Sequence, residues 1–167
     1  EQAAGELFRM PRRAQQQQAV DIGHVDADGF VVITDRKKEL IVNAYGKNIA
    51  PAPIENSLKS SRWISQAVVV GDRRQFLPAL LVPDFEALVP WAAGQGIQGS
   101  SQELVAHAAV RALIAAEVAK TNEHLARYEQ IRSWELLPAE FTLEGGELTP
   151  TMKVKRRVVN TKYKSVL

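Results

Sequence analysis

The sequence predicts one α+β domain, built on a small, partly antiparallel β-sheet with flanking helices and preceded by a short β-hairpin. Two apolar runs of β-type residues, 67–70 and 79–82, are separated by the polar stretch 71–75, which is typical of adjacent antiparallel strands joined by a loop. Helical patterns are mixed among these strands, and no long alternation of strand and helix is present. With 167 residues, of which 46% are hydrophobic, the chain can bury one ordinary core.

The amino-terminal part divides into two stretches of different character. Residues 1–20 include four consecutive glutamines and show no sustained apolar period, so we interpret them as a linker or remnant and place the domain at residues 21–167. Turn residues around Asp28 and Gly29 precede a β-type run and predict a hairpin. A further short strand is expected at residues 40–42, ended by Tyr45 and Gly46.

Helix signals follow in three places. Pro51 and Pro53 fit a helix start and predict a helix to about Lys59. Asp84 is a plausible N-cap for a helix through Ala92, although Pro90 inside it would cost roughly 3 kcal/mol unless the helix kinks.

The longest helix is expected farther along the chain. Ser100 and Glu103 have capping-box spacing, and the apolar period after them predicts one helix over about residues 101–125. A last strand is expected at 134–137, followed by a loop with two glycines and a basic tail. The tail contains Lys153, Lys155, Arg156 and Arg157.

Composition excludes several functional classes. The absence of cysteine rules out disulfides, thiolate zinc sites and a cysteine nucleophile, and three scattered histidines make no metal site. A net charge of +2 does not favour nucleic acid as a partner. No apolar run approaches the roughly 20 residues of a transmembrane helix, and no signal peptide is visible, so we expect a cytoplasmic protein.

Three features bear on chemistry, and each also has an ordinary structural explanation. The charged run 35–38 is typical of a solvated turn. Gly46 indicates a turn with positive φ, although a loop before a helix can also present N–H groups to an anion. The basic tail is typical of a frayed terminus.

Taken together and in order, however, these features resemble the carboxy-terminal domain of the acyl-adenylate-forming ligases, particularly the long-chain fatty acyl-CoA ligases. The matching motifs are DIGHVDADGF at 21–30, DRKKELI at 35–41, GKNIAP at 46–51 with IE at 54–55, and LTPTMKVKRR at 148–157. Such enzymes use ATP to convert a carboxylate to an acyl-adenylate, from which CoA then displaces AMP. Their small domain rotates between the two half-reactions.

The resemblance implies a role for particular residues. Lys153 corresponds to the catalytic lysine of adenylation, where a compact positive charge offsets charge developing at the α-phosphate. Asp21 and Arg36 correspond to nucleotide-binding residues, and Lys38 corresponds to the hinge. The loop with Tyr45, Gly46 and Lys47 corresponds to the one that approaches CoA and lines the pantetheine tunnel.

The resemblance also implies partners. The first is a large adenylation domain that precedes this one in the full-length enzyme, and the others are ATP or AMP, CoA and a fatty acid. Mg²⁺ is expected for the full-length enzyme but is not expected to bind to this domain. The isolated chain is therefore expected to be inactive. Peripheral membrane association stays open, as do two alternatives: the small domain of a ligase that loads a carrier protein, and a binding module without enzymatic activity.

Overall fold

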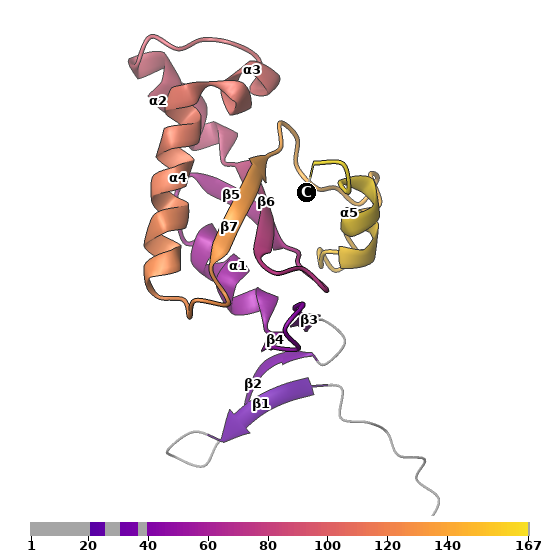
Figure 1. Ribbon diagram of the computed structural model, residues 1–167. Helices are drawn as coiled ribbons and strands as arrows, with labels where there is room; N and C mark the ends of the chain where they lie inside the picture. The colour runs from indigo at the N-terminus through magenta and orange to yellow at the C-terminus, as the bar shows by residue number, and fades with distance from the viewer. Residues whose placement is uncertain (1–20, 26–30, 37–39, 167) are drawn as a thin grey trace, which may run out of the picture. The chain divides into compact units, whose positions relative to one another are not determined.

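The computed structural model describes residues 21–25, 31–36 and 40–166, and the chain divides into two compact units, Glu1–Lys38 and Glu39–Leu167 (Figure 1). The first unit contains β1 (Asp21–Val25) and β2 (Val31–Arg36), which pair antiparallel. The predicted hairpin strands are confirmed. The turn expected at Asp28 and Gly29, and the linker expected at 1–20, lie outside the described residues.

The second unit begins with two very short strands, β3 (Ile41–Val42) and β4 (Asn48–Ile49), which pair antiparallel around a tight loop. Helix α1 (Pro51–Lys59) follows directly. Its two prolines stand in the first turn, where a missing N–H costs nothing, so the helix has the predicted bounds. Ile54 and Leu58 are buried on its inner face, as their spacing predicts.

The central sheet has the strand order β5 (Ile64–Val69), β6 (Leu77–Pro83), β7 (Ile131–Leu136). β5 and β6 are antiparallel, as predicted, whereas β6 and β7 are parallel. Every residue of β6 is buried, since this strand is central and both faces of the sheet are covered. The continuous apolar runs in the sequence follow from that double burial.

The two faces of the sheet belong to different clusters of buried side chains. One face, including Val69 and Leu81, packs against α1 and α4 (Ala108–Glu123). The other, including Val68 and Leu80, packs against the chain after β7 and against α5 (Arg156–Lys162), which contributes Val159. Figure 1 shows α4 and α5 on opposite sides of the sheet.

Helix α2 (Phe85–Gly94) confirms the expected N-cap, because the Asp84 carboxylate accepts hydrogen bonds from the N–H groups of Glu86 and Ala87 at 3.0 and 3.2 Å. The helix continues through Pro90. Pro90 is exposed, so its ring lies on the solvent side of the helix.

The prediction of one helix over 101–125 is wrong. The segment forms α3 (Ser101–Ala106), which has the expected capping box at Ser100 and Glu103, and then α4. His107 separates them in an extended conformation, with φ −70° and ψ 132°. Its Nδ1 accepts a hydrogen bond from the N–H of Ala109 at 3.2 Å and so caps the second helix. Apolar periodicity continues across His107, and therefore does not reveal the break.

The interpretation of the basic tail as a frayed end is also wrong. Residues Arg156–Lys162 form α5, and Val159 at its centre is fully buried. The helix is short and strongly charged, so its apolar content does not stand out in the sequence. Its burial depends on the second face of the sheet, which only the strand order creates.

Candidate functional site

The loop between β3 and β4 is built around the buried side chain of Asn43. Its Oδ1 accepts hydrogen bonds from the N–H groups of Tyr45 and Lys47 at 3.0 and 2.9 Å, and its backbone carbonyl accepts from Gly46 at 3.0 Å. Asn43 thereby satisfies three donors in a five-residue turn. The hydrogen bonds of Asn43 fix the backbone of the loop, and they leave the side chain of Tyr45 exposed.

Gly46 has φ +73°, the left-handed region in which glycine carries no steric penalty. A Cβ built there would meet nothing within 4 Å. Glycine is therefore favoured at position 46 by the backbone conformation. Space within this domain would not exclude a larger residue there. Tyr45 beside it is 68% exposed, which is unusual for a large aromatic side chain.

Backbone hydrogen bonds join this loop to the connection between β5 and β6. The N–H of Ala44 donates to Arg74 at 2.9 Å, and the N–H of Arg73 donates to Val42 at 2.8 Å. These bonds bring Tyr45 close to Gln75 and Phe76, thirty residues farther along the chain, because the two loops form one layer at this end of the sheet.

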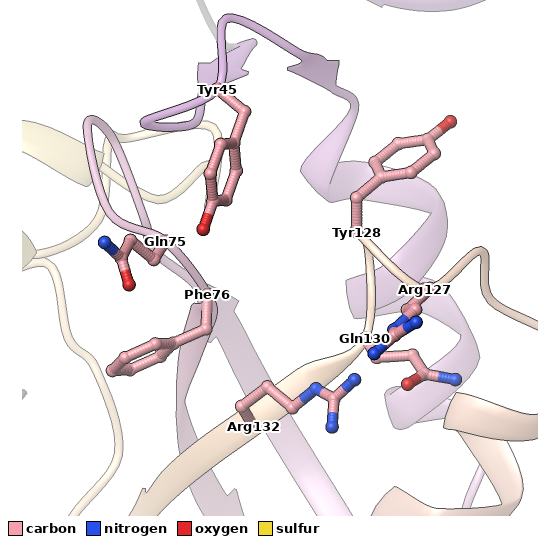
Figure 2. A pocket seen from close by; sticks show the side chains of 7 residues that line it. All are labelled: Tyr45, Gln75, Phe76, Arg127, Tyr128, Gln130 and Arg132. Carbon is pink, nitrogen blue, oxygen red and sulfur yellow. The ribbon is translucent and has the colours of Figure 1, made fainter.

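A pocket of about 400 Å³ lies beside Tyr45. In Figure 2, Tyr45, Gln75 and Phe76 line one side and Arg127, Tyr128 and Gln130 the other, with Arg132 between them at the start of β7. Arg127 and Arg132 are exposed, and neither forms an ion pair with any residue that the structure describes. Two cations beside three aromatic rings suit a ligand that carries phosphates and a planar base.

Lys153 lies in a second, separate loop. Leu148 and Val154 form an antiparallel bridge, the N–H of Thr149 donates to Lys153 at 2.8 Å, and the N–H of Lys153 donates back to the Thr149 hydroxyl at 3.0 Å. We call residues 148–154 the lysine hairpin. Met152 at its turn has φ +59°, a conformation that costs a non-glycine residue on the order of 1 kcal/mol. The Lys153 side chain is exposed.

The base of the lysine hairpin is anchored by Glu147, which is 2% exposed. Its backbone carbonyl accepts from the N–H of Lys155 at 2.7 Å. Its carboxylate pairs with Lys162, the last residue of α5, and accepts from the hydroxyl of Tyr163 directly after it. Burial alone would raise the pKa of Glu147, but the hydrogen bonds from Lys162 and the Thr142 backbone outweigh it and leave that pKa below its usual value.

A second anchor joins the hairpin to α1. Arg156, three residues after Lys153, donates from two nitrogens to the two carboxylate oxygens of Glu55 at 2.6 and 2.8 Å. Both side chains are largely buried, with 19% and 9% exposed. Glu55, which the sequence offers only as part of a family motif, thus has a structural role in joining α1 to the hairpin.

The expected nucleotide residues belong to the first unit. The register of the hairpin pairs the backbone of Asp21 with that of Arg36 across β1 and β2, so the strands bring the two positions together. Lys38 lies outside the described residues, and the division between the two units falls directly after it.

No group of three or more acidic or histidine side chains within the described ranges is arranged to hold a metal ion. None of the helices in this part of the chain is long and apolar enough to cross a membrane.

Sequence reasoning missed the residues of the pocket beside Tyr45 other than Tyr45 itself. Arg127 and Arg132 flank the start of β7, and Phe76 precedes β6. Their signal was weak: two arginines five residues apart next to a tyrosine also occur on ordinary surfaces. The parallel pairing of β6 with β7, which places Leu77 opposite Ile131, is what brings them together.

The domain therefore combines a small mixed sheet covered on both faces with two exposed features, the lysine hairpin and the loop that carries Tyr45. Residues 38–167 match the family model described as AMP-binding enzyme C-terminal domain. The match covers most of the chain, and the chain belongs to this family.

Its sequence relatives are ligases. It is 47% identical over 153 residues to the long-chain-fatty-acid–CoA ligase FadD15 of Mycobacterium tuberculosis, and 44% identical over 144 residues to the putative fatty-acid–CoA ligase FadD11 of the same species. These alignments cover 87% and 86% of this chain but only 24% and 25% of the relatives. The chain therefore spans about a quarter of their length, and corresponds to their carboxy-terminal domain.

Solved structures with a similar fold include adenylation domains of two reductases. The adenylation domain of a carboxylate reductase from Mycobacterium chelonae has a TM-score of 0.67 at 25% identity, covering 83% of this chain and 20% of that one. A didomain of carboxylic acid reductase from Segniliparus rugosus, with its carrier protein and AMP, has a TM-score of 0.60 at 26% identity, covering 89% of this chain and 19% of that one.

Proposed function

We propose that this domain serves both half-reactions of an AMP-forming long-chain fatty acid–CoA ligase, through two different loops. The observation that carries the proposal is Lys153, an exposed cation at the end of a hairpin anchored on both sides. An exposed lysine held on so rigid a base has little to do within the domain, and suits a site completed by a second domain. The identity to fatty-acid–CoA ligases supports the same function.

In the first half-reaction, Lys153 would enter the active site of the large domain. The fatty acid carboxylate attacks the α-phosphorus of ATP, and pyrophosphate leaves with its electron pair. An ammonium group positioned there offsets the negative charge that grows on the phosphate oxygens in the transition state. Arg36 and Asp21 would bind the nucleotide from the first unit, Arg36 through phosphate or ribose oxygens and Asp21 through the ribose hydroxyls.

In the second half-reaction, the loop with Tyr45, Gly46 and Lys47 would face the large domain after rotation about Lys38. The CoA thiolate attacks the acyl carbonyl carbon, and AMP leaves. The pocket beside Tyr45 would hold the nucleotide part of CoA: Arg127 and Arg132 would pair with its phosphates, and aromatic rings would contact its adenine. The division of the chain after Lys38 supports the hinge.

A carrier protein is the second candidate for the acyl acceptor. It is favoured by the likeness to the reductase didomain, whose structure includes a carrier protein. A tethered pantetheine has no adenosine phosphate to fill a cationic pocket, whereas free CoA does. The two arginines without ion-pair partners among the described residues therefore support CoA.

The remaining requirements come from the rest of the enzyme. The large amino-terminal domain would supply the fatty acid tunnel and most of the ATP site. Mg²⁺ would arrive with ATP and be held outside this domain. We further propose a cytoplasmic location and a role in lipid metabolism, because ATP and CoA are substrates available there.

The test separates the two half-reactions in the full-length enzyme. We expect Lys153→Ala to slow acyl-adenylate formation by roughly a hundredfold or more, because the variant has no ammonium group to stabilise the transition state. Thioester formation from supplied acyl-adenylate should change much less. Pyrophosphate release and CoA consumption in single turnovers measure the two steps.

Lys155→Ala is the matched control, since Lys155 is also exposed and lies two residues away. It should leave adenylation near normal. Equal losses of both half-reactions in Lys153→Ala, or a selective loss in Lys155→Ala instead, would contradict the assignment.

A further inference from the structure

Arg156 and Glu55 are joined to each other and also to the edge of the central sheet. β5 is an edge strand, with β6 on one side only. Val70 bonds to β6 through its N–H, which donates to Pro78 at 3.0 Å, so the peptide groups of Val69 point to the other, unpaired side. A buried edge must find partners for such groups.

The ion pair supplies these partners. Glu55 Oε1 accepts from the N–H of Val69 at 2.7 Å, and the Arg156 guanidinium donates to the carbonyl of Val69 at 3.0 Å. The carboxylate thus acts as an acceptor and the guanidinium as a donor, as a neighbouring strand would. The two residues are 101 positions apart, so this contact fixes the lysine hairpin on the part of the domain that carries α1.

We propose that Arg156 is a positioning residue for Lys153, an inference that rests on the proposed function. Between Arg156 and Lys153 there are only two residues, Val154 and Lys155, and both are bonded at the base of the hairpin. Glu147 fixes one side of that base, and the pair of Arg156 with Glu55 fixes the other. With both sides fixed, the Lys153 backbone has a defined place on the rigid unit.

The same pair links the two loops of the proposed cycle. α1 carries Glu55 and starts directly after β4, which closes the loop with Gly46. A rotation of this unit therefore moves the lysine hairpin and the Gly46 loop together, as one body. Loss of the guanidinium would remove one of the two anchors of the hairpin and leave the Gly46 loop in place, since that loop is held by Asn43.

The experiment uses the full-length ligase with Arg156→Gln, which removes the charge and the double hydrogen bond. Acyl-adenylate formation should fall roughly ten- to hundredfold, because small misplacement of a catalytic group costs that much. Thioester formation from supplied acyl-adenylate should stay within about twofold of wild type. Arg157→Gln, an exposed neighbour on the same helix, is the matched control and should leave both steps unchanged.

A second background tests whether Arg156 acts through Lys153. In the Lys153→Ala enzyme, adding Arg156→Gln should reduce adenylation by less than about twofold further, because the group that it positions is already gone. A full additional loss, or equal losses of both half-reactions in the single variant, would show that Arg156 only stabilises the fold and would overturn the inference.

A conservative variant covers the case in which Arg156→Gln does not fold. Arg156→Lys keeps the positive charge but has one nitrogen in place of two, so it cannot reproduce the paired bonds to both carboxylate oxygens of Glu55, and adenylation should fall by at least about threefold with the thermal melt near wild type. Normal adenylation in this variant would overturn the inference. If Lys153→Ala itself leaves adenylation intact, the proposed function fails first, and if only the Arg156 variants are normal, the positioning role alone fails.

Discussion

At the scale of single residues, the pocket beside Tyr45 joins side chains that the sequence alone leaves unrelated. Arg132 faces it from the start of β7 and Arg127 from the turn before that strand, and Phe76 lies opposite (Figure 2). Neither arginine forms an ion pair with another described residue, whereas Arg111 is paired with Glu135. Their positive charge is therefore available to a phosphate.

This charge yields a prediction on acceptor specificity. In the full-length enzyme, Arg127→Gln with Arg132→Gln should raise the KM for CoA by roughly ten- to a hundredfold, since removing an arginine that pairs with a phosphate costs about 1 kcal/mol or more. The KM for pantetheine, which lacks the nucleotide and its phosphates, should be unchanged. Steady-state kinetics with the two acceptors measure the difference.

Arg62→Gln is the control, because Arg62 stacks on Trp63 away from the pocket, with 4.5 Å to the ring centroid. An equal rise of the KM for both acceptors would mean that the arginines do not contact the nucleotide part of CoA.

At the scale of elements, an ion pair with a buried carboxylate helps to hold α5 in place. Glu147 is buried beneath it and pairs with Lys162, while Tyr163 contacts Phe141 edge to face with 5.8 Å between ring centroids. Because the folded protein holds the pKa of Glu147 below its unfolded value, the stabilisation is present above the unfolded pKa. It is lost as pH falls through the lower, folded pKa.

We therefore expect Glu147→Gln to destabilise the chain by about 1–3 kcal/mol at pH 7, the cost of weakening hydrogen bonds to a buried charged group. The difference from wild type should shrink as pH falls below the ordinary glutamate pKa and through the lower pKa of the folded carboxylate, because the wild-type side chain is then protonated too. Thermal melts of the 167-residue chain across this range measure it. Glu144→Gln, exposed in the same loop, should match wild type throughout, and a difference that persists at low pH would contradict the charge mechanism.

At the scale of the whole molecule, the chain has a core of its own and spans about a quarter of the length of its relatives. Both faces of the sheet are covered, and the second unit, Glu39–Leu167, starts within one residue of the family model. The prediction of one domain over 21–167 stays a prediction, as does the hinge at Lys38. The first unit, Glu1–Lys38, contains the β1–β2 hairpin with its two expected nucleotide positions.

The second unit, which holds both clusters of buried side chains, should accordingly unfold in one cooperative transition, and the isolated chain should show neither pyrophosphate exchange nor acyl-CoA synthesis with ATP, fatty acid and CoA. The activity requires more than this part, because the residues 1–167 match only about a quarter of the length of the relatives. Calorimetry and a coupled pyrophosphate assay test the two halves of this statement. Turnover by the highly purified chain would contradict the second half.

The sequence by itself determined the features that depend on neighbours along the chain. These include the strands at 67–70 and 79–82, the N-cap at Asp84, the turn at Gly46 and the motif around Lys153. Turn chemistry, capping and alternation are local, so a few adjacent residues suffice to predict them. The same holds for the family resemblance, which the ordered motifs carried and the family model confirmed.

Only the tertiary structure decided which distant residues meet. The break between α3 and α4 at His107 depends on a hydrogen bond from the N–H of Ala109 to the histidine side chain, and the spacing of apolar residues contains no sign of it. The burial of α5, the pocket beside Tyr45 and the contact of Arg156 with Glu55 all depend on β5 being an edge strand and β7 lying parallel to β6. Strand order is a global property, since it is chosen by the burial of both sheet faces at once, and no local pattern contains it.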